Sequence, residues 1–515
     1  MIVKIIRLLP IYLYHVVLGG SMNRFTAALL LQCLLVGIAA AAEGPINLSL
    51  KESLRYAIER NLDLKAGFYA PAQAESDIRK NRAIYETHLT LDTSYRDSTT
   101  FSPSIRDELH QSSFTLTPGA YRLLPSGGTL AVNFQNIRQE NSTVSPVGSY
   151  WSSSLELSLT QPLLKNFGRD ATELSIRVAE TAKDGSFSHL KTQIMTTIAQ
   201  VASEYYRLGS LQEDLVSKKV SLQLARTILS ETEARVKAGV MPAMEILNAQ
   251  FGVSSREKDL IDAEKAVSDQ VDLLRLLLQL GEGTDIVTTD KPERTVYQVN
   301  EADAVSRALA NRPELDELQS QLKSFELQTS VARTQTQPDL NLVTSAALTG
   351  ADSKFGRNVE RTGSMDYPVW SVGLQFDYPL GNQAAENDYI KNRLKTDQVK
   401  VQIDSLKASI VNEVRLALRA VQSNYKQLDV ADRARAYADE RLKAYMKKLE
   451  VGLATNKDLL DVENDLSTAR SNQIKAQAAY AISLQQLWKA TGEILDKDGV
   501  TISSDRSDSL YRGAR

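Results

Sequence analysis

The chain carries two copies of one long sequence pattern. Three pairs of segments match in the same order along the chain: 57–64 with 308–315, 86–91 with 337–342, and 237–240 with 450–453. The first two pairs share a shift of 251 positions (308 minus 57), and the third has a shift of 213 (450 minus 237). Two long copies fused in one chain favour a pseudo-symmetric assembly over a single catalytic cleft.

Composition narrows the class of protein. A chain of 515 residues usually forms several domains, but the repeat indicates one architecture built from two halves. We assign 43–298 to a first structural repeat, 299–495 to a second, and 496–515 to a polar C-terminal tail. Charged residues make up 24% of the chain and aromatic residues 6%, which excludes a disordered chain and a helical membrane bundle. The net charge is −3 and no basic tract is present, so we expect no nucleic-acid partner.

Residues 1–42 are predicted to be a signal peptide. A short basic region begins at Met22, and the apolar run that follows it ends in four alanines at 39–42. Residues 1–21 are either an extended leader or lie upstream of a true start at Met22, and we favour the second. A retained membrane anchor is the alternative, but the apolar run is short for one. The one cysteine, Cys33, lies inside this segment, so the exported chain is expected to have no disulfide and no thiol ligand.

Each half is predicted to contain a shorter helix and a long helical hairpin. The shorter helices span about 51–82 and 302–334. The segment 174–238 holds no proline and, as one helix, would be on the order of 95 Å long at 1.5 Å per residue. In both copies apolar residues alternate at spacings of three and four, which is typical of a narrow coiled-coil seam. The seam residues are Ile194, Ile198, Val201, Tyr205 and Leu208 in the first copy, and Ile410, Val414, Leu418, Val421, Tyr425 and Leu428 in the second.

Four segments of alternating polar and apolar residues are predicted to be strands: 89–95, 155–160, 340–348 and 372–378. The stretches that join them, 98–150 and 349–368, are rich in Ser, Asn, Gly, Pro and Asp and are predicted to be loops. The longer stretch contains two more alternating segments, 113–117 and 129–137. These either join the main sheet or form a separate hairpin.

The alternation within any single strand is also typical of a soluble sheet with one wet face. Four strands of about ten residues, in an exported chain without disulfides and between very long helices, instead indicate an outer-membrane β-barrel. Four strands cannot close a barrel, and open sheet edges are not tolerated in hydrocarbon. Each protein chain must therefore contribute its four strands to a barrel shared with other chains. Either two or three chains would close such a barrel.

Taken together, these segments resemble the TolC-like family of outer-membrane efflux proteins. The resemblance covers about 46–494 and rests on the duplication, on strand exits at Pro162 and Pro379, and on two helix-hairpin tips at 238–249 and 451–461. It implies a mixed α/β membrane protein in which four strands per chain join a shared trimeric β-barrel of 12 strands. The long coiled-coil helices would form an α-helical tunnel across the periplasm.

The resemblance also implies a function. It predicts a passive exit duct in the cell outer membrane, gated at its periplasmic end, for a tripartite efflux pump or a type I secretion system. The implied partners are two further copies of this chain in a homotrimer, a periplasmic adaptor protein, an inner-membrane transporter and outer-membrane lipid. No cofactor is implied.

An acidic pair, Asp458 and Asp461, follows the second tip. A spacing of three residues puts both carboxylates on one face of a helix. The resemblance identifies the pair with the family's aspartate gate, in which stacked acidic rings attract cations at the periplasmic mouth. The alternative is a pair of solvated surface acids without a role in gating.

Glu245 takes the corresponding place after the first tip, where the family has an acid that links neighbouring copies and helps to keep the tunnel shut. The usual tyrosine and arginine partners of that acid fall on Leu449 and Ala454. A latch in this chain would therefore use another partner. The nearby cations are Arg235, Lys237 and Lys457.

Gly239 and Gly452 each follow a long helix and are predicted to be its C-cap. Apolar side chains at such tips would be costly in solvent unless a partner covers them. The resemblance makes both tips docking sites for the adaptor, through Gly239, Val240, Met241, Gly452, Leu453 and Ala454.

No catalytic or metal-binding constellation is evident in the sequence. The exported chain has only His88, His110 and His189, which fall in unrelated segments, so we expect neither an enzyme nor a metal site. The rival interpretation is a periplasmic coiled-coil scaffold or adaptor with a soluble β domain. Strands in both copies, and the lack of a lipid anchor or retained helix in the predicted mature chain, favour the channel.

Overall fold

The computed structural model describes residues 46–102, 107–142, 148–281, 283–292 and 294–514. The predicted signal peptide 1–42, the start at Met22 and Cys33 lie outside the described residues. Within the described ranges, no helix is long and apolar enough to cross a membrane. The chain divides into two compact units, each drawing on both repeats. Of the described residues, the hairpin unit comprises 46–57, 201–281, 283–292 and 431–478, and the sheet unit comprises 58–102, 107–142, 148–200, 294–430 and 479–514.

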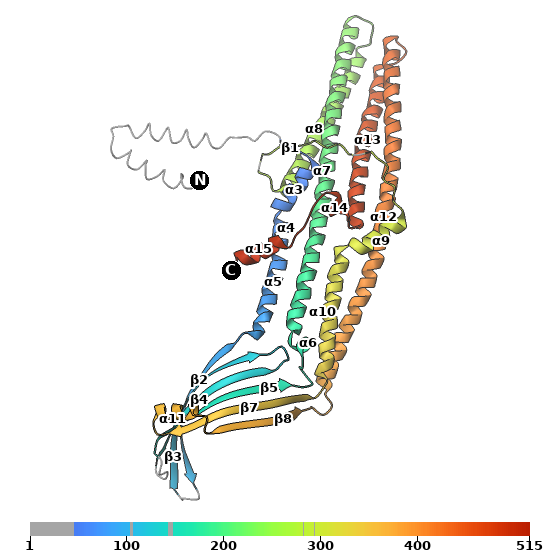
Figure 1. The fold of residues 1–515 in the computed structure, drawn as a ribbon. Coiled ribbons are helices and arrows are strands. Elements are labelled where there is room, and N and C mark those ends of the chain that lie inside the picture. Colours follow the sequence, from blue (N-terminus) through green and yellow to red (C-terminus); the bar gives the residue numbers. More distant parts are fainter. Residues whose placement is uncertain (1–45, 103–106, 143–147, 282, 293, 515) are drawn as a thin grey trace, which may run out of the picture. The chain divides into compact units, whose positions relative to one another are not determined.

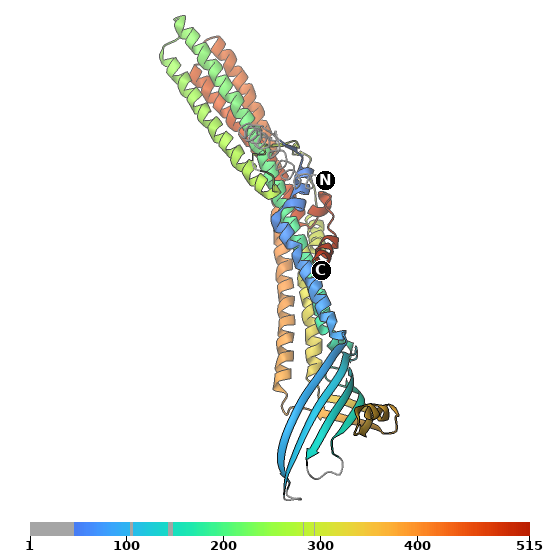
Figure 2. The ribbon, with the colours of Figure 1, turned by 90° about the vertical axis from the view of Figure 1, so that its left-hand side faces the viewer.

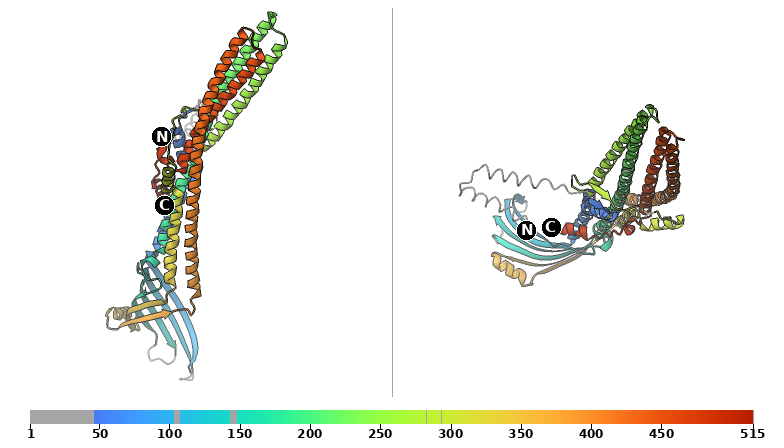
Figure 3. Two further views of the ribbon diagram at one scale, coloured as in Figure 1. Left: turned by 90° about the vertical axis from the view of Figure 1, so that its right-hand side faces the viewer. Right: turned by 90° about the horizontal axis from the view of Figure 1, so that it is seen from above.

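Four long helices form two helical hairpins, one from each repeat. The first hairpin is α7 (Leu174–Lys237) with α8 (Met244–Leu278), and the second is α12 (Gln383–Glu450) with α13 (Asn456–Ala490). The two helices of each hairpin lie side by side in Figure 1 and in Figure 3. The predicted proline-free helix is confirmed as α7, which has 64 residues and follows the single turn α6 (Arg169–Thr172).

A seam of apolar side chains holds the hairpin unit together. Its buried members come from α7, α12 and α13 and are Ile228, Leu442, Leu449, Leu459, Val462 and Leu466. A short parallel strand pair, β1 (Ile46–Leu48) and β6 (Ile286–Thr288), also belongs to this unit. The buried hydroxyl of Tyr205 in α7 donates to the carbonyl of Leu48 at 2.8 Å, which fixes the pair to the helix.

The two shorter predicted helices are each divided into consecutive pieces. The first becomes α3 (Leu50–Arg60), α4 (Leu62–Gly67), α5 (Tyr69–Arg82) and the 3-10 turn η1 (Ala83–Tyr85), and the second becomes α9 (Glu301–Asn311) and α10 (Pro313–Gln335). The break after α3 occurs at Asn61, whose side chain accepts from the N–H groups of Asp63 and Leu64 and so caps α4. The break after α9 occurs before Pro313, because the residue before a proline is disfavoured in the α conformation.

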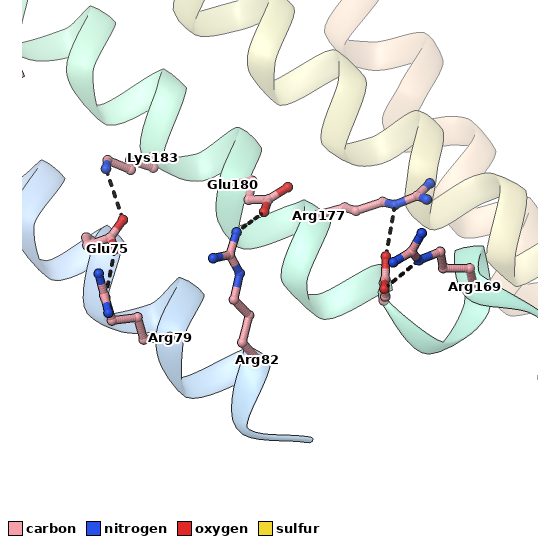
Figure 4. Close-up of polar contacts among 8 residues, drawn as sticks. Glu75, Arg79, Arg82, Arg169, Arg177, Glu180 and Lys183 are labelled. Atoms are coloured by element: carbon pink, nitrogen blue, oxygen red, sulfur yellow. Dashed lines mark hydrogen bonds and ion pairs between the residues drawn. The ribbon is translucent and has the colours of Figure 1, made fainter. Parts of the chain in front are cut away.

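Ion pairs join α5 to the first part of α7, as Figure 4 shows. Lys183 contacts Glu75 at 3.0 Å, and Arg82 contacts Glu180 at 2.8 Å. Burial alone would raise the pKa of Glu75. Hydrogen bonds from Lys183 and Arg79 outweigh burial, so the pKa of Glu75 is lowered. These contacts hold α5 against α7 within the sheet unit.

The residues assigned to a polar C-terminal tail, 496–515, include the second half of the short helix α14 (Ile494–Lys497) and all of α15 (Asp505–Gly513). Lys183 contacts Asp508 of α15 at 3.2 Å. The guanidinium of Arg506 lies 4.4 Å from the ring centre of Phe68, at the junction of α4 and α5. The end of the chain is therefore a folded part of the sheet unit.

A six-stranded antiparallel sheet completes the sheet unit (Figures 1 and 2). In spatial order its strands are β2 (His88–Ser102), β3 (Asp107–Leu123), β4 (Thr129–Ser142), β5 (Tyr150–Pro162), β7 (Asp339–Asp352) and β8 (Pro368–Asp377). The four predicted strands are confirmed within β2, β5, β7 and β8. The count of four strands per chain is wrong, because β3 and β4 lie in the sheet between β2 and β5. Most of the predicted loop 98–150 is therefore strand, and many of its polar residues, such as Thr115 and Asn133, lie on the face opposite Val132.

The predicted loop 349–368 is also largely regular structure. β7 continues to Asp352, and the short helix α11 (Phe355–Gly363) follows before β8 begins. α11 lies beside the sheet in Figures 1 and 2. The buried Asn358 of α11 donates to the hydroxyl of Ser153 in β5, and that hydroxyl donates to Asn136 in β4 at 2.6 Å. This buried polar chain joins β4, β5 and α11.

Candidate functional site

Both hairpin tips end a long helix with the same backbone turn. In each tip an N–H group donates to the carbonyl five residues earlier, at 3.0 Å for Val240 and 2.8 Å for Leu453. This is the Schellman pattern, which needs a residue in the left-handed conformation. Gly239 has a φ of 75° and Gly452 a φ of 76°. The prediction that these glycines are C-caps is confirmed.

The tips expose some of the predicted docking residues and cover others. Val240 is 73% exposed and Leu453 is 76% exposed, which is high for apolar side chains. Met241 and Ala454 instead pack against the buried seam of the hairpin unit. The tips therefore present Val240 and Leu453 to solvent, anchored by the residue that follows each of them.

Asp458 is bonded to its own helix end. Its Oδ2 atom accepts from the N–H of Thr455 at 2.9 Å and from the Thr455 hydroxyl at 2.7 Å. The hydroxyl oxygen in turn accepts from the N–H of Asp458 at 3.2 Å, so the two residues form a capping box. These hydrogen bonds, from the Thr455 backbone first and its hydroxyl second, lower the pKa of Asp458, whose carboxylate therefore stays ionised at neutral pH.

Asp461 lies on the same exposed side of α13 as Asp458. Leu459 and Val462 are only 3% and 2% exposed, because they point into the seam. The structure thus places the two acids on one solvent-facing side at the start of α13, as their spacing predicts. In the part of the chain that the structure describes, no group of three or more His, Cys, Asp or Glu side chains could hold a metal ion.

Glu245 lies in the first turn of α8. One of its carboxylate oxygens is buried and has no hydrogen-bond partner among the described residues. Within those residues no ion pair joins it to the cations near it in sequence, which are Arg235, Lys237 and Lys457. Leu449 is buried in the seam and Ala454 packs against it, so the positions that correspond to the family's latch partners contribute packing here.

A buried ion pair that the sequence analysis missed joins the two hairpins. Arg256 of α8 contacts the Glu463 Oε2 atom of α13 through Nη2 at 2.7 Å and through Nε at 2.8 Å. Their side chains are only 7% and 4% exposed. Ser221 of α7 donates to the other Glu463 oxygen, and Arg256 Nη1 donates to Asn464 at 3.2 Å. One charged pair therefore links three helices, α7 and α8 of the first repeat and α13 of the second.

The sequence contained a signal for this pair. The buried side of α8 includes Ala249, Arg256, Ala263 and Gln270, which are spaced by seven residues. A charged residue at one position of such a heptad seam needs a buried partner on a neighbouring helix, because an unpaired buried charge is very unfavourable. Spacing alone does not identify that partner, since α13 has several acids.

A second missed contact lies beside the gate candidates. Asn456, the first residue of α13, is 2% exposed, and its amide donates to the hydroxyl of Thr232 in α7 at 2.8 Å. The Thr232 hydroxyl in turn donates to the carbonyl of Ile228 at 2.7 Å. The start of α13, which carries Asp458 and Asp461, is thereby fixed to the other hairpin.

Comparison with known proteins identifies relatives over both repeats. The chain matches the family model described as outer membrane efflux protein over residues 54–279 and 304–493. The antibiotic efflux pump outer membrane protein ArpC of Pseudomonas putida is 23% identical over 483 residues, which cover 91% of this chain and 94% of that protein. The alkaline protease secretion protein AprF of Pseudomonas aeruginosa is 23% identical over 349 residues, which cover 66% of each chain.

Solved structures share the fold. The channel-forming CusC has a TM-score of 0.64 at 15% identity, with 87% of this chain and 92% of that chain covered. The outer membrane protein VceC of Vibrio cholerae has a TM-score of 0.62 at 15% identity, with 86% and 96% covered. The predicted fold class of long helices with a strand contribution to a barrel is confirmed, with six strands per chain in place of four.

Proposed function

We propose that this chain, which belongs to the outer membrane efflux protein family, is the outer-membrane exit duct of an efflux pump or secretion system. The observation that carries this proposal is the family match across both repeats, 54–279 and 304–493. Relatives named for antibiotic efflux and for protease secretion align with this chain at similar identity. The family consists of transport ducts, so the chain conducts cargo across the outer membrane of a Gram-negative cell.

The duct is a homotrimer that rests in outer-membrane lipid and meets a periplasmic adaptor and an inner-membrane transporter. The sheet supports assembly, because its two edge strands, β2 and β8, each pair on one side only among the described strands. The exposed apolar tips support the adaptor contact, since Val240 and Leu453 are otherwise costly in water. Energy for transport comes from the inner-membrane partner.

The gate lies at the hairpin tips. In three copies, Asp458 and Asp461 form two stacked acidic rings that hold cations at the mouth of the duct. The hydrogen bonds from Thr455 to Asp458 support this role, because they fix the carboxylate at the start of α13. Arg256 and Glu463 support the closed state by joining the hairpins, and the buried unpaired oxygen of Glu245 is available to a neighbouring copy.

Single-channel recording tests the gate. The double variant Asp458→Asn with Asp461→Asn removes both charges, while the asparagine at 458 keeps an oxygen that can accept from Thr455. We expect block by divalent cations to weaken about tenfold or more, because two rings of charge are lost. The matched control is Asp262→Asn, an exposed acid of α8 paired with Lys258 at 2.7 Å, which should leave the block unchanged. Equal block in the double variant and the wild type would rule out the acidic gate.

A further inference from the structure

The inserted strands β3 and β4 are integral parts of the sheet. β2 pairs with β3 from His88 to Ser102, and β4 pairs with β5 from Thr129 to Gln139. Asn136 of β4 is 2% exposed and is bonded to Ser153 of β5. The strand order places β3 next to β2 and β4 next to β5. If β3 and β4 formed a separate hairpin outside the wall, β2 would pair with β5 directly.

The inserted strands also continue both faces of the sheet in register. One row crosses the sheet with a residue from every strand and is apolar throughout: Leu89, Ala120, Val132, Leu157, Ala346 and Trp370. Leu89 is 84% exposed, Val132 is 42% exposed and Trp370 is 76% exposed, so water would face this row in a soluble sheet. The opposite face of the inserted strands is mostly polar: it carries Ser113, Thr115, Thr117, Asn133 and Gln135, with Tyr121, Ala131 and Ile137 among them.

This pattern is the one expected of a membrane wall. A transmembrane barrel strand alternates apolar residues toward lipid with polar residues toward the lumen. A hairpin that only decorated the barrel would have no reason to keep the same phase as its neighbours, because a shift of one residue reverses the faces. β3 and β4 therefore have the side-chain pattern of strands in the membrane.

The sheet must close through its edges. β2 and β8 each pair on one side only among the described strands. Unpaired backbone groups are not tolerated in hydrocarbon, so β2 of one copy must pair with β8 of the next. β2 belongs to the first repeat and β8 to the second. Every junction between neighbouring chains would therefore be the same β2–β8 contact.

Resting on the proposed trimeric duct, we propose that its barrel has 18 strands, six from each copy, with β3 and β4 widening the wall. At a strand spacing of about 4.8 Å and a tilt of about 40°, 18 strands give a diameter near 36 Å between backbones, and 12 strands about 24 Å. The widened part is lined by uncharged polar side chains, including Thr115, Asn133 and Gln135. The 18-stranded barrel is thus suited to cargo of larger cross-section than a 12-stranded barrel would pass.

Electron cryo-microscopy of the full chain in lipid nanodiscs tests the inference. We expect threefold symmetry and a continuous wall of 18 strands. A closed wall of 12 strands from three copies, with β3 and β4 outside it, would overturn the inference and leave the proposed duct intact. A closed wall of 12 strands from two copies would overturn the trimer of the proposed duct as well. A monomer with an open sheet would overturn the proposed function as well, so the two failures are distinguishable.

A deletion provides a second test. Removal of 107–142 takes out β3 and β4 together, and β2 and β5 stay antiparallel because an even number of strands is lost. Neutral polymers of graded size, added on the barrel side of single channels, report the width of the lumen. We expect the largest polymer radius admitted to fall by about a third in the deletion variant, in proportion to strand number. An unchanged size limit in a variant that inserts normally would contradict the inference, and the wild-type image decides it if the variant does not assemble.

Discussion

Removing one member of the buried Arg256–Glu463 pair should loosen the contact between the hairpins. Glu463→Leu would leave the Arg256 guanidinium buried. Its remaining contacts would be a hydrogen bond to Asn464 and an ion pair with Asp259, of its own helix, at 3.5 Å. Both side chains are more than nine-tenths buried, so solvent screens the charge little. Breaking a buried pair on one side costs about 3–5 kcal/mol. The same cost is expected for Arg256→Met, which leaves Glu463 with Ser221 as its main partner.

The double variant is predicted to behave differently from either single variant. Arg256→Met with Glu463→Leu replaces both charges by apolar side chains of similar size, so no uncompensated charge remains. Such replacements are about neutral, or stabilising by about 1–4 kcal/mol. The coupling energy between the two positions should therefore nearly cancel the summed cost of the two single changes, as expected of a direct charge interaction.

Native-state hydrogen exchange measures this effect locally, without a global unfolding transition. Because about 1.4 kcal/mol corresponds to a factor of ten, amides of α8 and α13 near the pair should exchange about 100- to 4,000-fold faster in each single variant. The double variant should restore the wild-type rates. Lys258→Met serves as control, because Lys258 makes an exposed ion pair with Asp262 and should change exchange no more than about twofold. If the double variant exchanges as fast as the single variants, or if the single variants match the wild type, the reasoning is refuted.

Two further predictions concern the tips and the end of the chain. Gly239→Ala and Gly452→Ala should each destabilise their hairpin tip by about 1–2 kcal/mol, because both glycines have a positive φ. Amide hydrogen exchange at the tip should become faster. The control Gly185→Ala, inside α7, should stabilise its helix by up to about 1 kcal/mol. Burial raises the pKa of Asp498 to about 6 from its ordinary value of 3.8, against a hydrogen bond from Gln485 that lowers it. The folded state then holds the proton more tightly, so stability should fall as pH rises from about 4 through 6. Asp498→Asn should remove the contribution of Asp498, so that thermal stability falls less between pH 4 and 6 in the variant than in the wild type. Equal slopes in the two proteins would contradict the assignment.

The long helices were predictable because their signal is local. Apolar residues at spacings of three and four mark the seam of α7 and α12 without knowledge of what packs against them, and Ile198 and Val414 are fully buried as that spacing requires. The C-caps at Gly239 and Gly452 follow from glycine alone at a helix end. The capping box of Thr455 and Asp458 was also readable, as a threonine three residues before an acid at a helix start.

The inserted strands were not predictable from composition, for a physical reason. A strand in a membrane wall has polar residues at every second position, so β3 and β4 contain enough Ser, Thr, Asn and Gln to look like loop. The alternation at 113–117 and 129–137 is visible in the sequence, but the place of these segments in the main sheet becomes evident only when the register aligns Val132 with Leu157 and Ala120. The Arg256–Glu463 pair was missed because its two residues are far apart in the chain and each resembles the many exposed charges around it.

We expect this chain to act as an assembled outer-membrane duct and not as a soluble periplasmic scaffold. Fractionation of cells on a density gradient, followed by carbonate extraction, tests it most directly. We predict that the full chain sediments with the outer membrane, resists carbonate and migrates as a trimer after mild detergent extraction. A chain recovered as a soluble periplasmic monomer would contradict the account.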